Sequence, residues 1–312
     1  MTKPLLSICI ATYNRGEYIG ETLESIILQV TDEVEIVIVD GASTDNTSTI
    51  VKGYVEVCKQ INYILLPSKG GVDYDYDQAV SFAHGEYCWL FTDDDLLKPG
   101  AISIVLSEIH KGYCLIAVNF QVMNKDFSKL LSNNYFKINV NELYDELKLE
   151  QLFCRVVQQM SFIGCVIINR DLWLKRERKF YFGTEFIHIG VIFQAPLPSP
   201  ALVVAEPYII IRWGNAQWTA RSFDIWMFKW PKLIWSFDNI PDKAKLSITN
   251  QEPWRELKNL FLHRFIGGYT IQSYRKYFLP MSISSIWKYF AFLIAYTPRW
   301  IARIGHYILK LL

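Results

Sequence analysis

The sequence predicts an α/β fold with a mostly parallel sheet flanked by helices and an amphipathic helical extension at the C-terminus. Short apolar runs alternate with segments whose apolar residues recur at helical spacing, which is the pattern of strand–helix–strand units. The runs are apolar throughout, as in parallel strands that are covered on both faces. We expect strands at residues 5–11, 34–39, 61–65, 87–91, 113–123 and 162–168, and a strand pair interrupted by Pro207 at 201–212.

The expected helices fill the intervals between these strands. Apolar residues recur at helical spacing after Gly16, after Asp45, after the Gly70–Gly71 pair and after Pro99. In the second half of the chain, helical spacing covers residues 142–160, 282–296 and 297–312.

Polar residues follow three of the expected strands directly. Tyr13 lies after the first strand, Asp40 closes the second, and Asp93, Asp94 and Asp95 follow the fourth. Ligands of parallel sheets bind outside the carboxyl ends of the strands, so we expect these side chains to converge on one edge. Carboxylate oxygens suit Mg²⁺ or Mn²⁺, with the phosphates of a substrate completing the shell. The alternative is an acidic turn that caps the next helix.

The composition allows a sizeable core and leaves an asymmetric distribution of charge. Hydrophobic residues make up 51% of the 312 residues, and the net charge is only +1. From Leu257 onward there is no Asp or Glu, while Lys and Arg recur. This asymmetry indicates an anionic surface as a partner of the tail.

The last expected helix has two unlike sides. Trp300, Ile301, Ile304, Ile308 and Leu311 lie on one side, and Arg299, Arg303, His306 and Lys310 lie on the other. This is the pattern of a helix that lies in a membrane interface and is attracted by anionic lipid. The alternative is an amphipathic helix that docks on the protein itself.

The cysteines and the N-terminal residues indicate the cellular compartment in which we expect the protein. The six cysteines contain no Cys-x-x-Cys pair and lie mostly in apolar runs, which indicates neither a zinc site nor a disulfide framework. We expect no signal peptide, and no run reaches the ~20 apolar residues of a spanning helix. The expected location is the cytoplasm, peripheral on the inner face of the membrane.

Three segments together resemble a known family. They are SICIATYNR at residues 7–15, IVIVDGASTDNT at 36–47 and GEYCWLFTDDD at 85–95. In this order and at these spacings they resemble the nucleotide-sugar-binding half of glycosyltransferase family 2, whose fold is the Rossmann-like GT-A fold. The chain looks most similar to abequosyltransferase-like members. The resemblance covers about the first 120 residues well.

The resemblance implies how the donor's base is held. Thr12, Tyr13 and Asn14 occupy the positions that cradle the base in the family. Asp40 would accept a hydrogen bond from an N–H group of the base, which suits uracil or thymine. The alternative roles are core packing for Tyr13 and capping of the next turn for Asp40.

The resemblance also implies a metal site. Asp93 and Asp95 match the family's Asp-x-Asp motif and would hold the divalent ion that clamps the diphosphate, while Asp94 would contact the donor sugar or ribose. One departure is that the sequence VDYDYD at residues 72–77 stands where many members have Ala-Arg-Asn. We expect Asp73 to face the nucleotide and the other two acids of this segment, Asp75 and Asp77, to be solvated.

In the family, the segment after the expected strand at 162–168 supplies acceptor-side residues, including the general base. Here Glu185 and His188 are three residues apart and would share one face of a helical turn. Either can take the proton of the acceptor hydroxyl, and His188 can instead ligate the metal. The alternatives are a solvated helix start for Glu185 and a buried, hydrogen-bonded histidine for His188.

A Trp-rich segment follows the last expected strand. Aromatic rings pack well on sugar rings, so we expect residues 213–221 to form a lid, with Arg221 as a phosphate contact. For Trp226 and Trp230, helical spacing favours the core.

The sequence thus predicts an inverting, metal-dependent glycosyltransferase that moves a sugar from a nucleoside-diphosphate-sugar to a saccharide hydroxyl. The acceptor is expected to be lipid-linked, in surface polysaccharide assembly, and no nucleic acid is expected as a partner. The expected parts are the nucleotide-sugar half at 1–125, the acceptor half with the lid at 126–240, and the membrane-associating extension at 241–312. The alternatives are a sugar nucleotidyltransferase and a non-catalytic sugar-binding or membrane scaffold protein.

Overall fold

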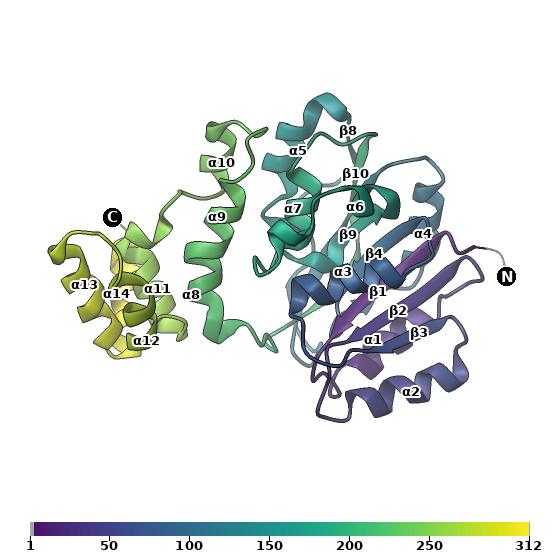
Figure 1. The fold of residues 1–312 in the computed structure, drawn as a ribbon, viewed down its shortest axis with the longest axis horizontal. Helices are drawn as coiled ribbons and strands as arrows, with labels where there is room; N and C mark the ends of the chain where they lie inside the picture. The colour runs from purple at the N-terminus through teal and green to yellow at the C-terminus, as the bar shows by residue number, and fades with distance from the viewer. Residues whose placement is uncertain (1–2, 312) are drawn as a thin grey trace. The chain divides into compact units, whose positions relative to one another are not determined.

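The computed structural model of the chain describes residues 3–311. The chain divides into two compact units, with the boundary between Asn215 and Ala216 (Figure 1). We call them the N-terminal unit and the C-terminal unit. The parts predicted from the sequence, with boundaries at residues 125 and 240, were defined by their functional roles and not by compactness. They stay a prediction.

The N-terminal unit contains the sheet of the described chain. Its strands are β1 (Leu6–Thr12), β2 (Val34–Asp40), β3 (Ile61–Leu65), β4 (Tyr87–Phe91), β5 (Leu96–Leu97), β6 (Leu115–Asn124), β7 (Leu130–Ser132), β8 (Glu142–Tyr144), β9 (Val166–Asn169) and β10 (Ala201–Trp213). The order across the sheet is β3-β2-β1-β4-β9-β6-β10-β5, while β7 pairs with β6 and β8 with β10. Strands β3, β2, β1, β4, β6 and β10 run in one direction, and β9 runs against its two neighbours.

Helices connect these strands. They are α1 (Ile19–Ile27), α2 (Thr47–Val57), α3 (Val72–Phe82), α4 (Ala101–Ile109), α5 (Leu149–Val156), α6 (Arg170–Lys175) and α7 (Ile187–Phe193). Helix α3 packs over β1 and β2 (Figure 1). The predicted α/β class with a mostly parallel sheet is confirmed.

The first half of the chain follows the expected elements closely, and the second half differs from them. The helix expected over residues 142–160 was wrong at its start, because Glu142–Tyr144 pairs with β10 as a strand and α5 begins only at Leu149. The strand expected at 162–168 begins at Val166, after a 3-10 turn at Ile163–Cys165. Pairing across the sheet therefore overrides the local apolar spacing in these segments.

Pro207 does not divide β10 into two strands. The register between β10 and β6 shifts between Val204 and Ile209, so the proline occupies an irregularity where it need not donate a ladder hydrogen bond. The amide side chain of Asn119 donates to the carbonyl of Ala205 at 2.6 Å, and Asn141 accepts from the N–H of Ala205 at 2.9 Å. Side chains thus replace the ladder bonds at this point.

Strand β4 lies in the centre of the sheet and is buried at every residue. Trp89 is 0% exposed, and its indole N–H donates to the carbonyl of Gly164 at 2.8 Å. Burial of such a side chain stabilises the fold by roughly 2–3 kcal/mol. The aspartates that follow β4 are therefore attached to a rigid strand.

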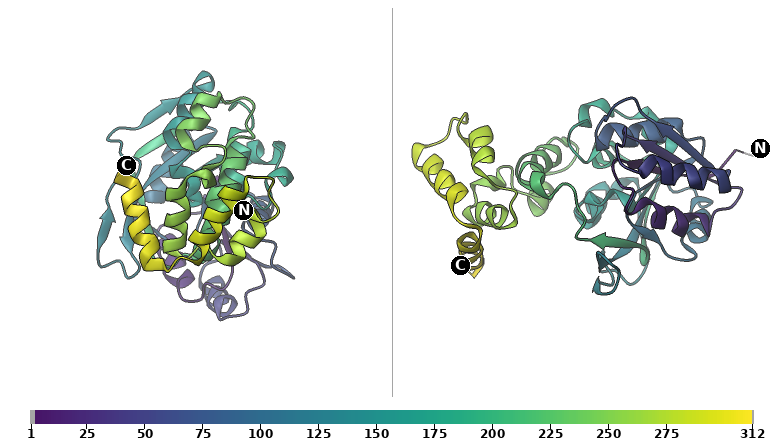
Figure 2. Two further views of the ribbon diagram at one scale, coloured as in Figure 1. Left: turned by 90° about the vertical axis from the view of Figure 1, so that its left-hand side faces the viewer. Right: turned by 90° about the horizontal axis from the view of Figure 1, so that it is seen from below.

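The C-terminal unit is helical in its described part, as the views in Figure 2 show. Its helices are α8 (Ser222–Asp224), α9 (Trp230–Ile234), α10 (Asp242–Ile248), α11 (Leu257–Ile266), α12 (Ile271–Ser273), α13 (Ser285–Tyr296) and α14 (Arg299–Leu311), with π-helical turns at Ile225–Lys229 and Tyr274–Phe278. An aromatic core forms around Phe223, Tyr269 and Phe278. Trp230 is 2% exposed and Trp226 packs against the core, so their predicted core position is confirmed.

Helix α14 docks on the C-terminal unit by one side only. Ala302 is fully buried, and the helix packs against α11. Trp300, Ile304 and Ile308, on the predicted apolar side, are 67%, 52% and 54% exposed. The side chains of Lys310 and Leu311, which the predicted pattern includes, lie outside the described residues. Among residues 3–311, no helix combines the length and the apolarity that crossing a membrane requires.

Gly85 provides a test of how closely α3 and β4 are joined to β1. A Cβ at this position would lie 2.5 Å from Ser7 Oγ and 2.7 Å from Ser7 N. We predict that Gly85→Ala lowers the free energy of unfolding by about 1–3 kcal/mol because the strand backbone has to shift. Urea unfolding measures the change.

The matched control is Gly53→Ala in α2, where nothing lies within 4 Å of the added Cβ. This substitution should instead stabilise the protein by about 0.5–1 kcal/mol, since alanine favours the helix. Equal effects of the two substitutions would contradict the close approach at Gly85.

Candidate active site

The register of the sheet brings the ends of three strands to one edge. Thr12 pairs with Asp40 across β1 and β2, and Ile10 pairs with Phe91 across β1 and β4. Thr12 lies two residues after Ile10, and Asp93 lies two residues after Phe91. The predicted convergence of the strand ends is therefore confirmed.

Asp93 and Asp94 share one cation. The Arg15 guanidinium lies 3.4 Å from Asp93 Oδ1 through Nε and 3.1 Å from Asp94 Oδ2 through a terminal nitrogen. Asn215 adds a hydrogen bond of 2.8 Å from its amide nitrogen to Asp94 Oδ2. Both carboxylates thus face one point at the sheet edge, where Arg15 neutralises part of their charge.

Asp95 faces a different set of partners. Its carboxylate accepts from the Thr92 hydroxyl at 2.5 Å and from the backbone N–H of Arg212 at 2.7 Å. The side chain joins the end of β4 to β10. The structure therefore brings Asp93 together with Asp94, and it does not bring Asp95, the predicted second member of the metal pair, to the same cation.

Burial disfavours the charged form of the three carboxylates. Desolvation, followed by the negative charge of Asp94, raises the pKa of Asp93 to about 7, although Arg15 opposes the shift. Burial also raises the pKa of Asp94 and of Asp95. An added cation at this edge would relieve the repulsion.

The predicted base-binding residues lie in two loops that are bonded to each other. Asn14 has a positive φ of 52°, and its side-chain oxygen accepts from the N–H of Thr44 at 2.7 Å. Asp40 is fully buried and accepts from the N–H of Ser43 and from the Tyr63 hydroxyl, each at 2.7 Å. These bonds fit the alternative role of Asp40 as a residue that caps the next turn, and its predicted contact with a base stays a prediction.

Tyr13 and Thr12 have different surroundings. The Lys69 ammonium lies 3.5 Å from the centre of the half-buried Tyr13 ring. Thr12 is 3% exposed, and its carbonyl accepts from the N–H of Gly41 at 2.9 Å. A base that stacks on Tyr13 would thus meet a ring that already attracts a cation.

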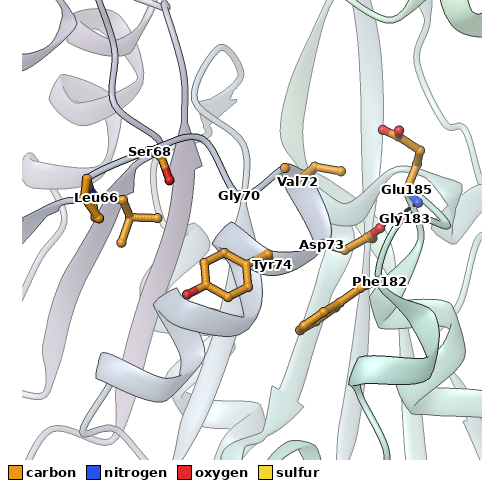
Figure 3. A pocket seen from close by; sticks show the side chains of 11 residues that line it. Leu66, Ser68, Gly70, Val72, Asp73, Tyr74, Phe182, Gly183 and Glu185 are labelled. Carbon is orange, nitrogen blue, oxygen red and sulfur yellow. Dashed lines mark hydrogen bonds between the residues drawn. The ribbon is translucent and has the colours of Figure 1, made fainter.

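A pocket of about 340 Å³ lies between the start of α3 and the loop before α7 (Figure 3). Its lining includes Glu185, which has a positive φ of 71°, a conformation that is costly for a residue with a side chain. The Asp73 carboxylate accepts from the N–H of Glu185 at 2.8 Å and from that of Ile187 at 2.9 Å. Asp73 therefore holds the Glu185 loop in place.

Burial raises the pKa of Asp73 to about 6, while the two backbone N–H donors partly oppose the shift. Both carboxylate oxygens of Asp73 accept hydrogen bonds from the backbone of this loop. The predicted contact of Asp73 with the nucleotide stays a prediction.

The expectation that Asp75 and Asp77 are solvated was wrong. They are only 4% and 6% exposed. Asp77 accepts from the Trp173 indole at 2.9 Å and pairs with Arg178 at 2.7 Å, and burial raises the pKa of Asp75 to about 6. The partners of Asp77 are about a hundred residues away in the sequence, so local helical spacing did not show them.

His188 lies in the core. It is 1% exposed, and its Nε2 lies 2.7 Å from the carbonyl oxygen of Met160. Burial lowers its pKa to about 4, although the Met160 carbonyl opposes the shift. This position fits the alternative of a buried histidine better than that of a base or a metal ligand, while Glu185 lines the pocket.

The acid pair has the donor set for a divalent ion. In the part of the chain that the structure describes, no group of three or more His, Cys, Asp or Glu side chains is placed to hold a metal. Mg²⁺ is commonly held by one or two carboxylates together with substrate phosphates, so a complete protein cage is not required. Asp93, which is buried, and Asp94, which is partly buried, face one cation and fit this arrangement.

The sequence profile of glycosyl transferase family 2 matches residues 7–165, half of the chain. The chain belongs to glycosyltransferase family 2. The matched range contains β1 to β4, the acid triplet and Arg15, and it ends just before β9. The predicted family is thereby confirmed.

Relatives of this family 2 chain include bacterial glycosyltransferases. Abequosyltransferase of Salmonella typhimurium is 25% identical over 235 residues, which are 70% of this chain and 69% of the relative. Glycosyltransferase GlyG of Streptococcus pneumoniae is 26% identical over 177 residues, 56% of this chain and 58% of that protein. The chain therefore spans about three fifths to two thirds of the length of these two relatives.

Solved structures show the same fold. TarS of Staphylococcus aureus in complex with UDP matches 96% of this chain and 92% of its own, with a TM-score of 0.60 and 15% identity. A mannosyltransferase of Pyrobaculum calidifontis in complex with GDP-Man and Mn²⁺ matches 99% of this chain and 85% of its own, with a TM-score of 0.56 and 16% identity. The predicted GT-A fold is confirmed.

Arg15 and Asn215 were not predicted as site residues. Arg15 lies three residues after the end of β1, so a basic residue near the carboxyl end of a strand was the available signal. Asn215 lies 121 residues from Asp94 and reaches it through the end of β10, which no local pattern indicates.

Buried His188 predicts a dependence of stability on pH. Its pKa of about 4 in the folded protein lies below about 6.5 in an unfolded chain, so the unfolded state binds the proton first as the pH falls. The contribution is fully present above pH ~6.5 and is lost progressively down to ~4, by about 3 kcal/mol. His188→Gln, which keeps an N–H donor, should reduce this loss in denaturant titrations at several pH values.

Parallel curves of unfolding free energy against pH for wild type and His188→Gln would contradict the buried neutral ring.

The two candidate bases are separated by turnover. His188→Gln should retain turnover where the folded protein is assayed, and Glu185→Gln should lower kcat by about 10²–10⁴. The opposite result would assign the base to His188.

Proposed function

We propose that the chain is a metal-dependent, inverting glycosyltransferase. It transfers a sugar from a nucleoside-diphosphate-sugar to a hydroxyl of a lipid-linked saccharide in surface polysaccharide assembly. The observation that carries the proposal is the pair Asp93 and Asp94, which face one cation at the carboxyl edge of a family 2 sheet. Hard oxygen donors at this edge suit a metal-bound diphosphate.

The related proteins support the substrate class. The solved structures bind UDP, UDP-GlcNAc, or GDP-Man with Mn²⁺. A relative in Bacillus subtilis is a putative teichuronic acid biosynthesis glycosyltransferase, and one in Campylobacter jejuni acts on a saccharide linked to PP-undecaprenol. Nucleotide donors and polyprenyl-linked acceptors are therefore the first substrates to test.

Asp93 and Asp94 would hold Mg²⁺ or Mn²⁺ together with the diphosphate. When bound, the ion would neutralise the negative charge that develops on the leaving nucleoside diphosphate. Asp95 is a positioning residue, since its bonds to Thr92 and to the backbone of Arg212 fix the direction of the acid turn.

Glu185 is the proposed general base. It lines the pocket on a loop that Asp73 holds by two hydrogen bonds, so its backbone is fixed relative to α3. Its carboxylate takes the proton of the acceptor hydroxyl. The acceptor oxygen then bonds to the anomeric carbon from the face opposite the diphosphate, whose C–O bond breaks with its electron pair on the leaving oxygen.

The C-terminal helices are proposed to bind an anionic membrane surface. On α14, Trp300, Ile304 and Ile308 are exposed, and Arg299 and Arg303 are exposed as well. Helix α13 adds Ile286, Tyr289, Phe290 and Tyr296, each at least 46% exposed. Apolar and aromatic side chains beside arginines suit the headgroup region, where a lipid-linked acceptor is presented.

The metal proposal is tested with Asp94→Asn, which removes a charge and keeps the shape of the side chain. We predict that this substitution lowers kcat/KM by about a hundredfold or more with a matched donor and acceptor. It should also abolish the extra thermal stabilisation that Mn²⁺ gives to the donor-bound protein, because binding to the folded state raises stability.

The donor is identified by thermal stabilisation across a panel of nucleotide-sugars, with and without Mn²⁺. Asp171→Asn, a change of an exposed acid of α6 that pairs loosely with Lys175 at 3.9 Å, is the control and should behave as wild type. Full turnover and Mn²⁺-dependent stabilisation in Asp94→Asn would refute the proposed metal site.

The membrane proposal predicts that apolar residues of α14 decide vesicle binding. The triple change Trp300→Ser, Ile304→Ser and Ile308→Ser should reduce sedimentation of the full chain with phosphatidylglycerol-containing vesicles by at least about tenfold. Pure phosphatidylcholine vesicles should bind the wild type more weakly, because the arginines lose their anionic partner.

The matched control changes three apolar residues of the N-terminal unit to serine. Leu28, Val57 and Leu147 are 82%, 77% and 96% exposed, so their loss should leave sedimentation unchanged. Unchanged sedimentation of the α14 variant would exclude this helix as the contact.

A further inference from the structure

We propose that Arg15 occupies the place of the divalent ion in the donor-free protein and moves to the donor's diphosphate when metal and donor bind. The inference rests on the proposed function, and it assigns to Arg15 a role at that site. Its guanidinium contacts Asp93 Oδ1 at 3.4 Å and Asp94 Oδ2 at 3.1 Å, the oxygens that face the common cation.

A guanidinium and a divalent ion cannot both hold these oxygens. Asp93 and Asp94 are flanked by Arg15 and by the amide of Asn215, and an ion bound between the two carboxylates would lie against the positive charge of Arg15. Two positive charges in direct contact repel each other strongly in a site that is shielded from water. Arrival of the ion therefore displaces the guanidinium.

The Arg15 side chain can leave without moving its loop. The backbone N–H of Arg15 donates to Thr47 Oγ1 at 2.8 Å, and that of Gly16 donates to Asp45 at 3.1 Å. Beyond the acids, the Arg15 side chain donates a hydrogen bond of 3.2 Å to the carbonyl of Asn215, and its guanidinium lies 5.7 Å from the centre of the Tyr18 ring. The anchor thus lies in the main chain, while the guanidinium is held mainly by the carboxylates that the metal would take.

Arg212, the other arginine at this edge, is fixed in place. Its guanidinium donates to the carbonyls of Asp94 and Lys125 at 3.0 and 2.8 Å, and it pairs with Glu21 at 2.6 Å. Arg212 is 7% exposed. These bonds use all three nitrogens of Arg212, so Arg15 is the arginine that can change partner.

The diphosphate needs such a cation in this chain. Residues 72–77 contain three aspartates and no basic residue, where many members of the family have Ala-Arg-Asn. A planar guanidinium bonds phosphate oxygens in pairs and suits this role better than an ammonium group. Displaced from the acids, Arg15 lies beside the expected position of the diphosphate.

The exchange predicts effects of opposite sign on two ligands measured separately. In Arg15→Met, Mn²⁺ alone should bind about tenfold more tightly, because a competitor that occupies the acids about nine-tenths of the time is removed. UDP or GDP without metal, in EDTA, should bind about tenfold more weakly, because a phosphate contact is lost. Electron paramagnetic resonance measures free Mn²⁺, and calorimetry measures the nucleotide.

Two further variants complete the experiment. Arg155→Met is the control, since Arg155 forms a similar ion pair with Glu142 at 3.0 Å, and both affinities should equal those of wild type. Arg15→Lys keeps the charge and loses the planar fork, so Mn²⁺ affinity should stay within about twofold of wild type while nucleotide affinity falls. This variant serves as the test if Arg15→Met fails to fold.

The outcomes separate the two proposals. If wild type binds neither Mn²⁺ nor nucleotide, alone or together, the proposed function fails. If wild type binds both and Arg15→Met leaves the Mn²⁺ affinity unchanged or lowers it, the exchange is refuted and Arg15 has a structural role only. For Arg15→Lys, an unchanged nucleotide affinity refutes the exchange in the same way.

Discussion

The structure of the N-terminal unit depends on negative charge that is buried at the end of a rigid strand. Strand β4 is inaccessible along its whole length, and Asp93, Asp94 and Asp95 follow it without an intervening loop. Buried carboxylates are unfavourable unless cations or hydrogen bonds compensate them. Arg15 approaches from the end of β1, while Asn215 and the backbone of Arg212 approach from the end of β10. The acids thus tie distant segments to one edge.

Other buried acids organise the surrounding loops in the same way. Asp40 accepts from Ser43 in the turn after β2 and from Tyr63 within β3, and Asp73 holds the loop that carries Glu185. Asp77 joins α3 to Trp173 and Arg178. In each case a carboxylate accepts hydrogen bonds from a segment that is distant in sequence. The candidate site is therefore preorganised by charge as well as by apolar packing.

The parts of this account that were predictable from sequence are those with local causes. Apolar runs and the acids behind them located β1 to β4 and the shared edge, because each signal lies within a few consecutive residues. The strand at Glu142–Tyr144 and the burial of Asp75 and Asp77 depend on partners elsewhere in the fold, so local spacing predicted them wrongly. The sharing of Arg15 by Asp93 and Asp94 also depends on how the turn after β4 is fixed from β10.

The central claim is that Asp93 and Asp94 hold the metal that binds the donor's diphosphate. The most direct measurement is anomalous X-ray scattering from crystals grown with Mn²⁺ and the nucleoside diphosphate that stabilises the protein most. We predict one manganese peak within coordination distance of Asp93 and Asp94, at about 2.0–2.2 Å, with phosphate oxygens in the same shell. A bound diphosphate with no manganese at these carboxylates, or with manganese at another site, would contradict it.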